Sequence, residues 1–159
     1  MLVSVPLGMV TFGIGHIEYV LGMLRLAKAE GLDSKLIRLG AWATWLGVGV
    51  TAWYIVVRSG PKGDSTLAWV ALPYTLLLAS TAGVATGLAL QGARDLPLAL
   101  GSVLFLLSDL VIAMRMFHPD LFAQIPDSIR GDLVWLHYGP AQALIVSSAL
   151  VASDKGEPR

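Results

Sequence analysis

The sequence predicts an all-α fold: a polytopic bundle of transmembrane helices, five of them in this chain. Of its 159 residues, 55% are hydrophobic and only 14% are charged. Soluble domains carry about 25% charged residues, so this chain has too few to cover a surface that faces water. A further indication is the length of its apolar runs, because about 20 helical residues are needed to cross a bilayer.

Five such runs follow one another along the chain. They cover residues 2–27, 36–58, 66–90, 96–117 and 131–152. The first contains His16, Glu18 and Arg25, whereas the third carries no charge. None alternates apolar and polar residues as the strand of a membrane barrel does. The connections are too short to hold a separate soluble domain, so we expect residues 1–159 to form a single transmembrane helical domain.

The distribution of Lys and Arg predicts the orientation of the bundle. With alternate connections on alternate sides, seven basic residues fall on the side of the C-terminus and four on the other. Basic residues favour the cytoplasmic side, which places the C-terminus of this multi-pass cell membrane protein in the cytoplasm. An aromatic belt is expected at the outer ends of the helices, formed by Trp53, Tyr54, Trp69 and Trp135.

Small residues mark surfaces where helices can pack closely. Ala79, Gly83 and Gly87 form a small-xxx-small row on the third run. Gly47 and Gly49 offer a similar surface on the second run. We expect these residues to serve helix packing and nothing more.

Composition and motifs exclude several functions. Basic and acidic residues number 11 each, so the chain has no net charge with which to bind nucleic acid. Without cysteine, a hydroxyl, carboxylate or imidazole must carry any chemistry. The sequence contains no GxSxG, HExxH or glycine-rich phosphate loop, and no complete set of metal ligands. We therefore expect no nucleic acid partner, no metal and no cofactor.

Asp109 is the most informative polar residue in the apolar runs. It lies within GSVLFLLSDLVIAM, where a short side chain does not reach water from either end of the helix. A carboxyl that lipid desolvates holds its proton, so we expect Asp109 to act as a proton donor. The alternative is a structural carboxyl held by a hydrogen bond between helices.

Other polar residues are predicted at a similar depth. The rise of 1.5 Å per residue places a set of them within about 6 Å of the bilayer midplane: His16, Tyr74, Asp109, Tyr138 and Gln142. Glu18 and Tyr19 lie beside His16 on the first run, and His16 fits a structural histidine as well as a catalytic one. Pro73 and Pro140 bend their helices next to this layer, as is typical of helices that border a cavity.

Four motifs resemble, in chain order, those of the lysoplasmalogenase (YhhN-like) membrane family. FGIGHIEYVLGM resembles its helix with a His-x-x-Tyr pattern, and LPYTLLLASTAG resembles its central tyrosine helix. GSVLFLLSDLVIAMRMF resembles its Ser-Asp helix, and WLHYGPAQALIV resembles its helix with tyrosine and Ala-Gln. The matching residues in this chain are His16, Tyr19, Tyr74, Ser108, Asp109, Tyr138 and Gln142.

The resemblance implies an eight-helix enzyme that cleaves the vinyl ether bond of lysoplasmalogens to a fatty aldehyde and a glycerophospho head group. In such an enzyme Asp109 is the general acid, and the other matching residues bind the lysophospholipid substrate. Membrane lipid surrounds the protein. The family also has an earlier helix with a Gly-Asp pair. The first run here begins at residue 2 with no basic residue before Arg25, which fits an internal helix better than a signal peptide.

We therefore expect this chain to lack three helices and one catalytic carboxylate, with Glu18 as the residue able to replace that carboxylate. His137–Tyr138 stands where the family has paired tyrosines, and Gly139–Pro140 replaces small helix-forming residues. Hydrolysis of a vinyl ether needs an acid and a nearby anion, as paired carboxylates provide at acetal bonds. Two other classes stay open: a lipid-binding or transport bundle without turnover, and an inactive truncated fragment that forms homo-oligomers.

Overall fold

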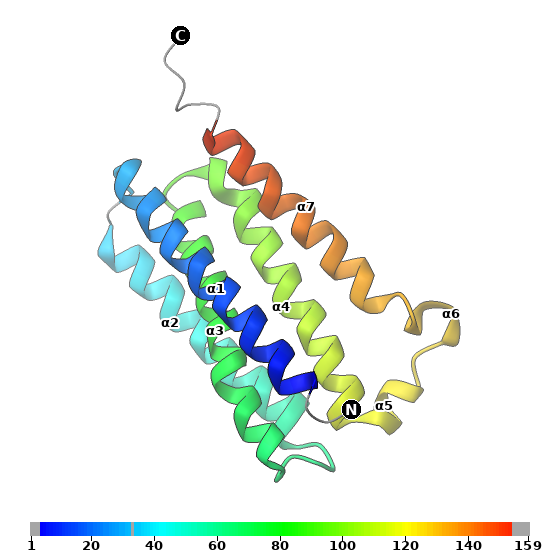
Figure 1. Ribbon diagram of the computed structural model, residues 1–159. Coiled ribbons are helices and arrows are strands. Elements are labelled where there is room, and N and C mark those ends of the chain that lie inside the picture. The colour runs from blue at the N-terminus through cyan, green and yellow to red at the C-terminus, as the bar shows by residue number, and fades with distance from the viewer. Residues whose placement is uncertain (1–3, 33, 154–159) are drawn as a thin grey trace.

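The computed structural model describes residues 4–32 and 34–153. These residues form helices joined by short connections, and none of them lies in a strand (Figure 1). The long helices are α1 (Ser4–Ala29), α2 (Lys35–Trp53), α3 (Thr66–Ala89), α4 (Leu96–Phe117) and α7 (Leu133–Ser153). Shorter elements are a π-helix (Tyr54–Arg58), a 3-10 helix (Ala93–Asp95), α5 (Pro119–Ala123) and α6 (Asp127–Arg130). The long helices coincide with the five predicted runs, which confirms the all-α fold.

Four of the five predicted membrane crossings are supported by the length and composition of the described helices. Within the described ranges, four stretches are long and apolar enough to cross a membrane: Val5–Ala29, Lys35–Arg58, Thr66–Ala89 and Ala93–Phe117. α7, whose side chains the structure describes only as far as residue 148, is not among them. Four predicted membrane helices are thus supported on this measure, and the fifth crossing stays a prediction.

α3 lies at the centre of the bundle. It packs against α1, α2 and α4, and α7 packs along α4 on the side away from α2 (Figure 1). Consecutive long helices run in opposite directions, as their short connections require (Figure 1). Because α1 rests on α3 and α7 rests on α4, a groove between α1 and α7 houses the cavities described below.

The interface between α2 and α3 is built on small residues, as the sequence predicts. A Cβ atom at Gly83 would lie 2.8 Å from Cα of Trp42, and one at Gly49 would lie 2.7 Å from Cβ of Ala79. Only glycine allows the two backbones to approach so closely. The prediction that Gly47 also packs a neighbouring helix is wrong, since no described atom lies within 4 Å of its Cβ position.

The aromatic belt is only partly as predicted. Tyr54, Trp69 and Trp135 are 61%, 53% and 67% exposed, which fits side chains that face the membrane interface. Trp53 is instead buried, and its indole N–H donates to a backbone carbonyl of α3 at 2.8 Å. Trp53 thus joins α2 to α3 beside the π-helix, because a buried indole needs a hydrogen-bond acceptor.

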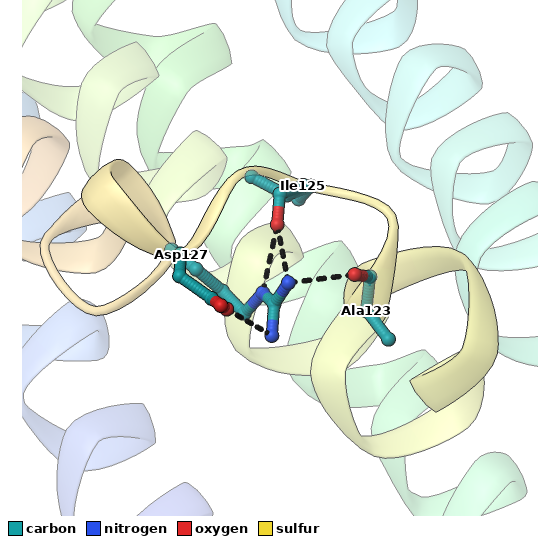
Figure 2. A network of polar contacts seen from close by, with 4 residues as sticks. Ala123, Ile125 and Asp127 are labelled. Atoms are coloured by element: carbon teal, nitrogen blue, oxygen red, sulfur yellow. Dashed lines mark hydrogen bonds and ion pairs between the residues drawn. The ribbon is translucent and has the colours of Figure 1, made fainter.

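The connection between α4 and α7 is held together by Arg130 (Figure 2). Its guanidinium donates to the carbonyl of Ala123 at 2.6 Å and, from Nε, to the carbonyl of Ile125 at 2.9 Å. It also forms an ion pair with Asp127 at 2.7 Å. These bonds satisfy carbonyls outside the regular helices and shape the short helices α5 and α6, which the sequence analysis did not predict.

Candidate active site

A tyrosine and a carboxyl from neighbouring helices are hydrogen bonded inside the bundle. Tyr74 follows Pro73 in the first half of α3, and Asp109 lies about two turns before the end of α4. The Tyr74 hydroxyl donates a hydrogen bond to Oδ2 of Asp109. A carboxyl bound in this way keeps its second oxygen, Oδ1, for another partner.

This pair lies in the wall of a large apolar cavity, which we call the Asp109 cavity. Its volume is about 390 Å³, and residues of α1, α3, α4 and α7 line it. Four hydroxyl- or carboxyl-bearing residues contribute to a lining that is otherwise almost entirely apolar: Tyr74, Thr75, Asp109 and Tyr138. Phe12 and Trp135 also line it and are 48% and 67% exposed, so the cavity opens between α1 and α7.

A second and more polar cavity lies next to the first, and we call it the His16 cavity. Its volume is about 430 Å³. Phe12 and Tyr138 line both cavities, so the two adjoin along the groove. The polar residues that line the His16 cavity are Thr11, His16, Glu18, Tyr19, Tyr138 and Gln142.

A third cavity, of about 330 Å³, continues the groove toward the start of α4. Glu18 and Tyr19 line it as well as the His16 cavity. Arg94 lines it and forms an ion pair with Glu30 at the end of α1. The groove therefore runs from an apolar end beside Asp109 to a charged end beside Arg94.

A match to a family model shows which family the chain belongs to. The family model of the YhhN family matches residues 2–149. The chain belongs to the YhhN family. This finding confirms the resemblance that the four motifs indicate, and the matched segment of the YhhN protein contains both Tyr74 and Asp109. Comparison with curated proteins and with solved structures finds no match.

Five predicted site residues of the YhhN protein do not line the Asp109 cavity: His16, Glu18, Tyr19, Ser108 and Gln142. Ser108 lines none of the three cavities: it is fully buried, and its hydroxyl donates to the carbonyl of Phe105 at 2.8 Å. Glu18 is exposed and lines the His16 cavity, so it does not share a cavity with Asp109. Within residues 4–32 and 34–153, no group of three or more His, Asp or Glu side chains is placed to hold a metal ion.

Sequence analysis missed three residues that shape the groove of the YhhN protein. Thr81 lies 3.0 Å from Nδ1 of His16. The Phe105 ring centroid lies 4.6 Å from that of His16 and 5.4 Å from that of Tyr138, so Phe105 packs against both rings in the wall of the His16 cavity. Trp135 was predicted only as part of the aromatic belt. Apolar and threonine positions of this kind are common in membrane helices, so no pattern in the sequence marks them.

Proposed function

We propose that this YhhN protein is a membrane-embedded hydrolase that cleaves the vinyl ether bond of lysoplasmalogens, releasing a fatty aldehyde and a glycerophospho head group. One observation carries the proposal. Asp109, held by the Tyr74 hydroxyl, lies in the wall of an apolar cavity of about 390 Å³. The four motifs that resemble the lysoplasmalogenase family support the choice of substrate.

The Asp109 cavity suits a single long hydrocarbon chain. Its volume lies in the range of small-ligand sites, about 300 to 1,000 Å³, and its lining offers few polar groups. The groove opens between α1 and α7 beside the exposed side chains of Phe12 and Trp135. An amphiphile dissolved in the bilayer can therefore place its alkenyl chain in the cavity while its polar end stays in the groove.

Asp109 supplies the proton in the first step. Because Tyr74 donates to Oδ2, the protonated carboxyl carries its own proton on Oδ1. This proton is transferred to the vinyl carbon that does not bear the ether oxygen. The neighbouring carbon becomes part of an oxocarbenium ion, and Asp109 becomes a carboxylate. The Tyr74 hydrogen bond stabilises that anion, and the anion stabilises the cation beside it.

Water completes the reaction. It adds to the oxocarbenium carbon and gives a proton back to Asp109, which restores the acid. The hemiacetal then collapses: its hydroxyl loses a proton, the bond to the glycerol oxygen breaks, and that oxygen is protonated. One water is consumed, and Asp109 ends as it began. This cycle runs with one carboxyl, and Glu18 stays a predicted second carboxylate in the neighbouring cavity.

The test is Asp109→Asn in purified protein, assayed for release of fatty aldehyde from a lysoplasmenyl lipid. We expect the rate to fall by about 100-fold or more, as on removal of a general acid. The matched control is Asp120→Asn, the same change at an exposed residue of α5. Aldehyde release by folded Asp109→Asn above about a tenth of the parent rate contradicts the assignment. Binding of the lipid without turnover by the parent protein favours a lipid-binding protein instead.

A further inference from the structure

The hydrogen bonds of Thr81 favour one tautomer of His16. Its Nδ1 lies 3.0 Å from Oγ1 of Thr81, and the Thr81 hydroxyl itself donates to the carbonyl of Leu77 at 3.1 Å. A hydroxyl has one proton, and the Leu77 carbonyl receives it. With the Thr81 proton on the Leu77 carbonyl, Nδ1 of His16 is the donor to Thr81. In the neutral imidazole this leaves Nε2 without a proton and with a free lone pair.

Nε2 of His16 is a buried acceptor without a donor. The residue is 3% exposed, and Nε2 has no hydrogen-bond partner among the described residues. The ring is held edge-on between Phe105, at 4.6 Å between centroids, and Tyr19, at 5.7 Å. A buried polar atom left unpaired costs free energy, so it calls for an explanation such as a bound ligand. His16 lines the cavity of about 430 Å³ that adjoins the Asp109 cavity.

The position of His16 relative to Asp109 limits what that ligand is. Phe105, against which His16 packs, lies one turn before Asp109 on α4, about 6 Å along the helix axis. Tyr138 lines both cavities, so no helix separates the two sites. A substrate whose vinyl ether reaches Asp109 therefore has atoms only a few bonds away in the adjoining cavity that His16 lines.

We propose that Nε2 of His16 accepts a hydrogen bond from the free hydroxyl on the middle carbon of the lysolipid glycerol. This inference rests on the proposed function. That hydroxyl is the nearest donor to the vinyl ether in a lysoplasmalogen. In a two-chain lipid the same oxygen carries an acyl group and has no proton to donate, so its lone pairs would face the lone pair of Nε2. His16 is thus a specificity-determining residue that selects lysolipids over two-chain lipids.

The test is a binding comparison that does not depend on turnover. A saturated 1-O-alkyl lysolipid, which lacks the vinyl ether, is titrated into the purified protein in detergent by calorimetry beside its 2-methoxy analogue. We expect the parent protein to bind the free hydroxyl form at least about 10-fold more tightly. His16→Phe keeps a ring against Phe105 but removes the acceptor, so the preference should disappear. His118→Phe, the same substitution in the connection after α4, should retain it.

A second variant guards against misfolding of His16→Phe. The amide of His16→Asn can still donate toward Thr81 but does not extend to the position of Nε2, so the preference should disappear there too. Equal binding of the two analogues by the parent protein overturns the inference. So does an undiminished preference in a folded His16 variant. Absence of aldehyde release by the parent protein would instead reject the proposed hydrolase function and leave the binding result standing.

Discussion

The Tyr74 hydroxyl on α3 donates a hydrogen bond to Oδ2 of Asp109 on α4, and this bond joins two helices that line the apolar cavity. It fixes which carboxyl oxygen is already occupied and therefore which one can face a ligand. Pro73 precedes the tyrosine, so the donor lies where the backbone hydrogen bonding of α3 is interrupted. The orientation of the Asp109 carboxyl thus depends on α3 as much as on α4.

Removal of the Tyr74 hydroxyl should slow catalysis without changing the shape of the cavity. Tyr74→Phe keeps the ring but withdraws the donor from Asp109, and loss of one hydrogen bond to a charged group corresponds to about a 10-fold lower kcat. KM should change little because the lining keeps its shape. Steady-state assays of aldehyde release measure both constants. Tyr54→Phe, at an exposed tyrosine of the π-helix, is the matched control, and equal rates for Tyr74→Phe and the parent protein would argue against the role of this bond.

The length of the bound chain should depend on the free volume beside Asp109. Ala113 lines the Asp109 cavity, and Ala113→Phe would occupy part of it. We expect kcat/KM for long alkenyl chains to fall about 10-fold relative to short ones, since each excluded methylene forfeits about 0.8 kcal/mol. Ala43→Phe on the exposed face of α2 controls for the added ring. An unchanged chain-length profile would place the alkenyl chain elsewhere.

Close packing of α2 on α3 should make Gly83 far less tolerant than Gly47. The added methyl group of Gly83→Ala would meet the backbone of Trp42 at 2.8 Å, and we expect a loss of about 1 to 3 kcal/mol in the free energy of unfolding. Gly47→Ala meets no atom within 4 Å and should be neutral or slightly stabilising, because alanine favours helix. Thermal unfolding in detergent compares the two variants. A lower melting temperature for Gly47→Ala than for Gly83→Ala would contradict the packing analysis.

The predicted orientation can be tested by labelling single introduced cysteines, because the chain has no cysteine of its own. Lys62→Cys lies in the connection after the π-helix, and Lys28→Cys lies at the opposite end of the bundle near the end of α1. If the C-terminus is cytoplasmic, a membrane-impermeant maleimide added to intact cells should label Lys62→Cys and spare Lys28→Cys. Both should react after the cells are opened. The reverse pattern would invert the predicted topology.

The long helices could be predicted because the bilayer imposes a length and an apolar composition on each of them. The shorter elements could not, because they depend on particular side-chain contacts. The connection after α4 owes its shape to bonds from Arg130 to backbone carbonyls, and neither hydropathy nor periodicity encodes such bonds. Trp53 is a similar case, since its buried indole depends on a hydrogen bond to a single backbone carbonyl of α3.

Site residues could be predicted where a polar side chain stands out in an apolar helix. They could not be predicted where their role depends on contacts with neighbouring helices. Asp109 and Tyr74 stand out because polar groups in membrane helices need a partner or a function. Their pairing required the knowledge that α3 and α4 pack together. Ser108 precedes Asp109, but successive helical residues point about 100° apart, and its hydroxyl is used by the carbonyl of Phe105. Thr81, which contacts Nδ1 of His16, belongs to no motif that would mark it in the sequence.

Under the proposed function, the groove between α1 and α7 determines which substrate concentration governs the rate. Exposed Phe12 and Trp135 flank the opening of the Asp109 cavity, so an incoming lipid passes apolar side chains rather than a water-filled mouth. The relevant quantity is then the mole fraction of lysolipid in the membrane or micelle, and not its molarity in the buffer. Diluting the substrate with inert lipid at constant total concentration should slow the enzyme. A hydrolase with this groove would thus draw its substrate from the surrounding bilayer, whose lipid composition would set the rate of turnover.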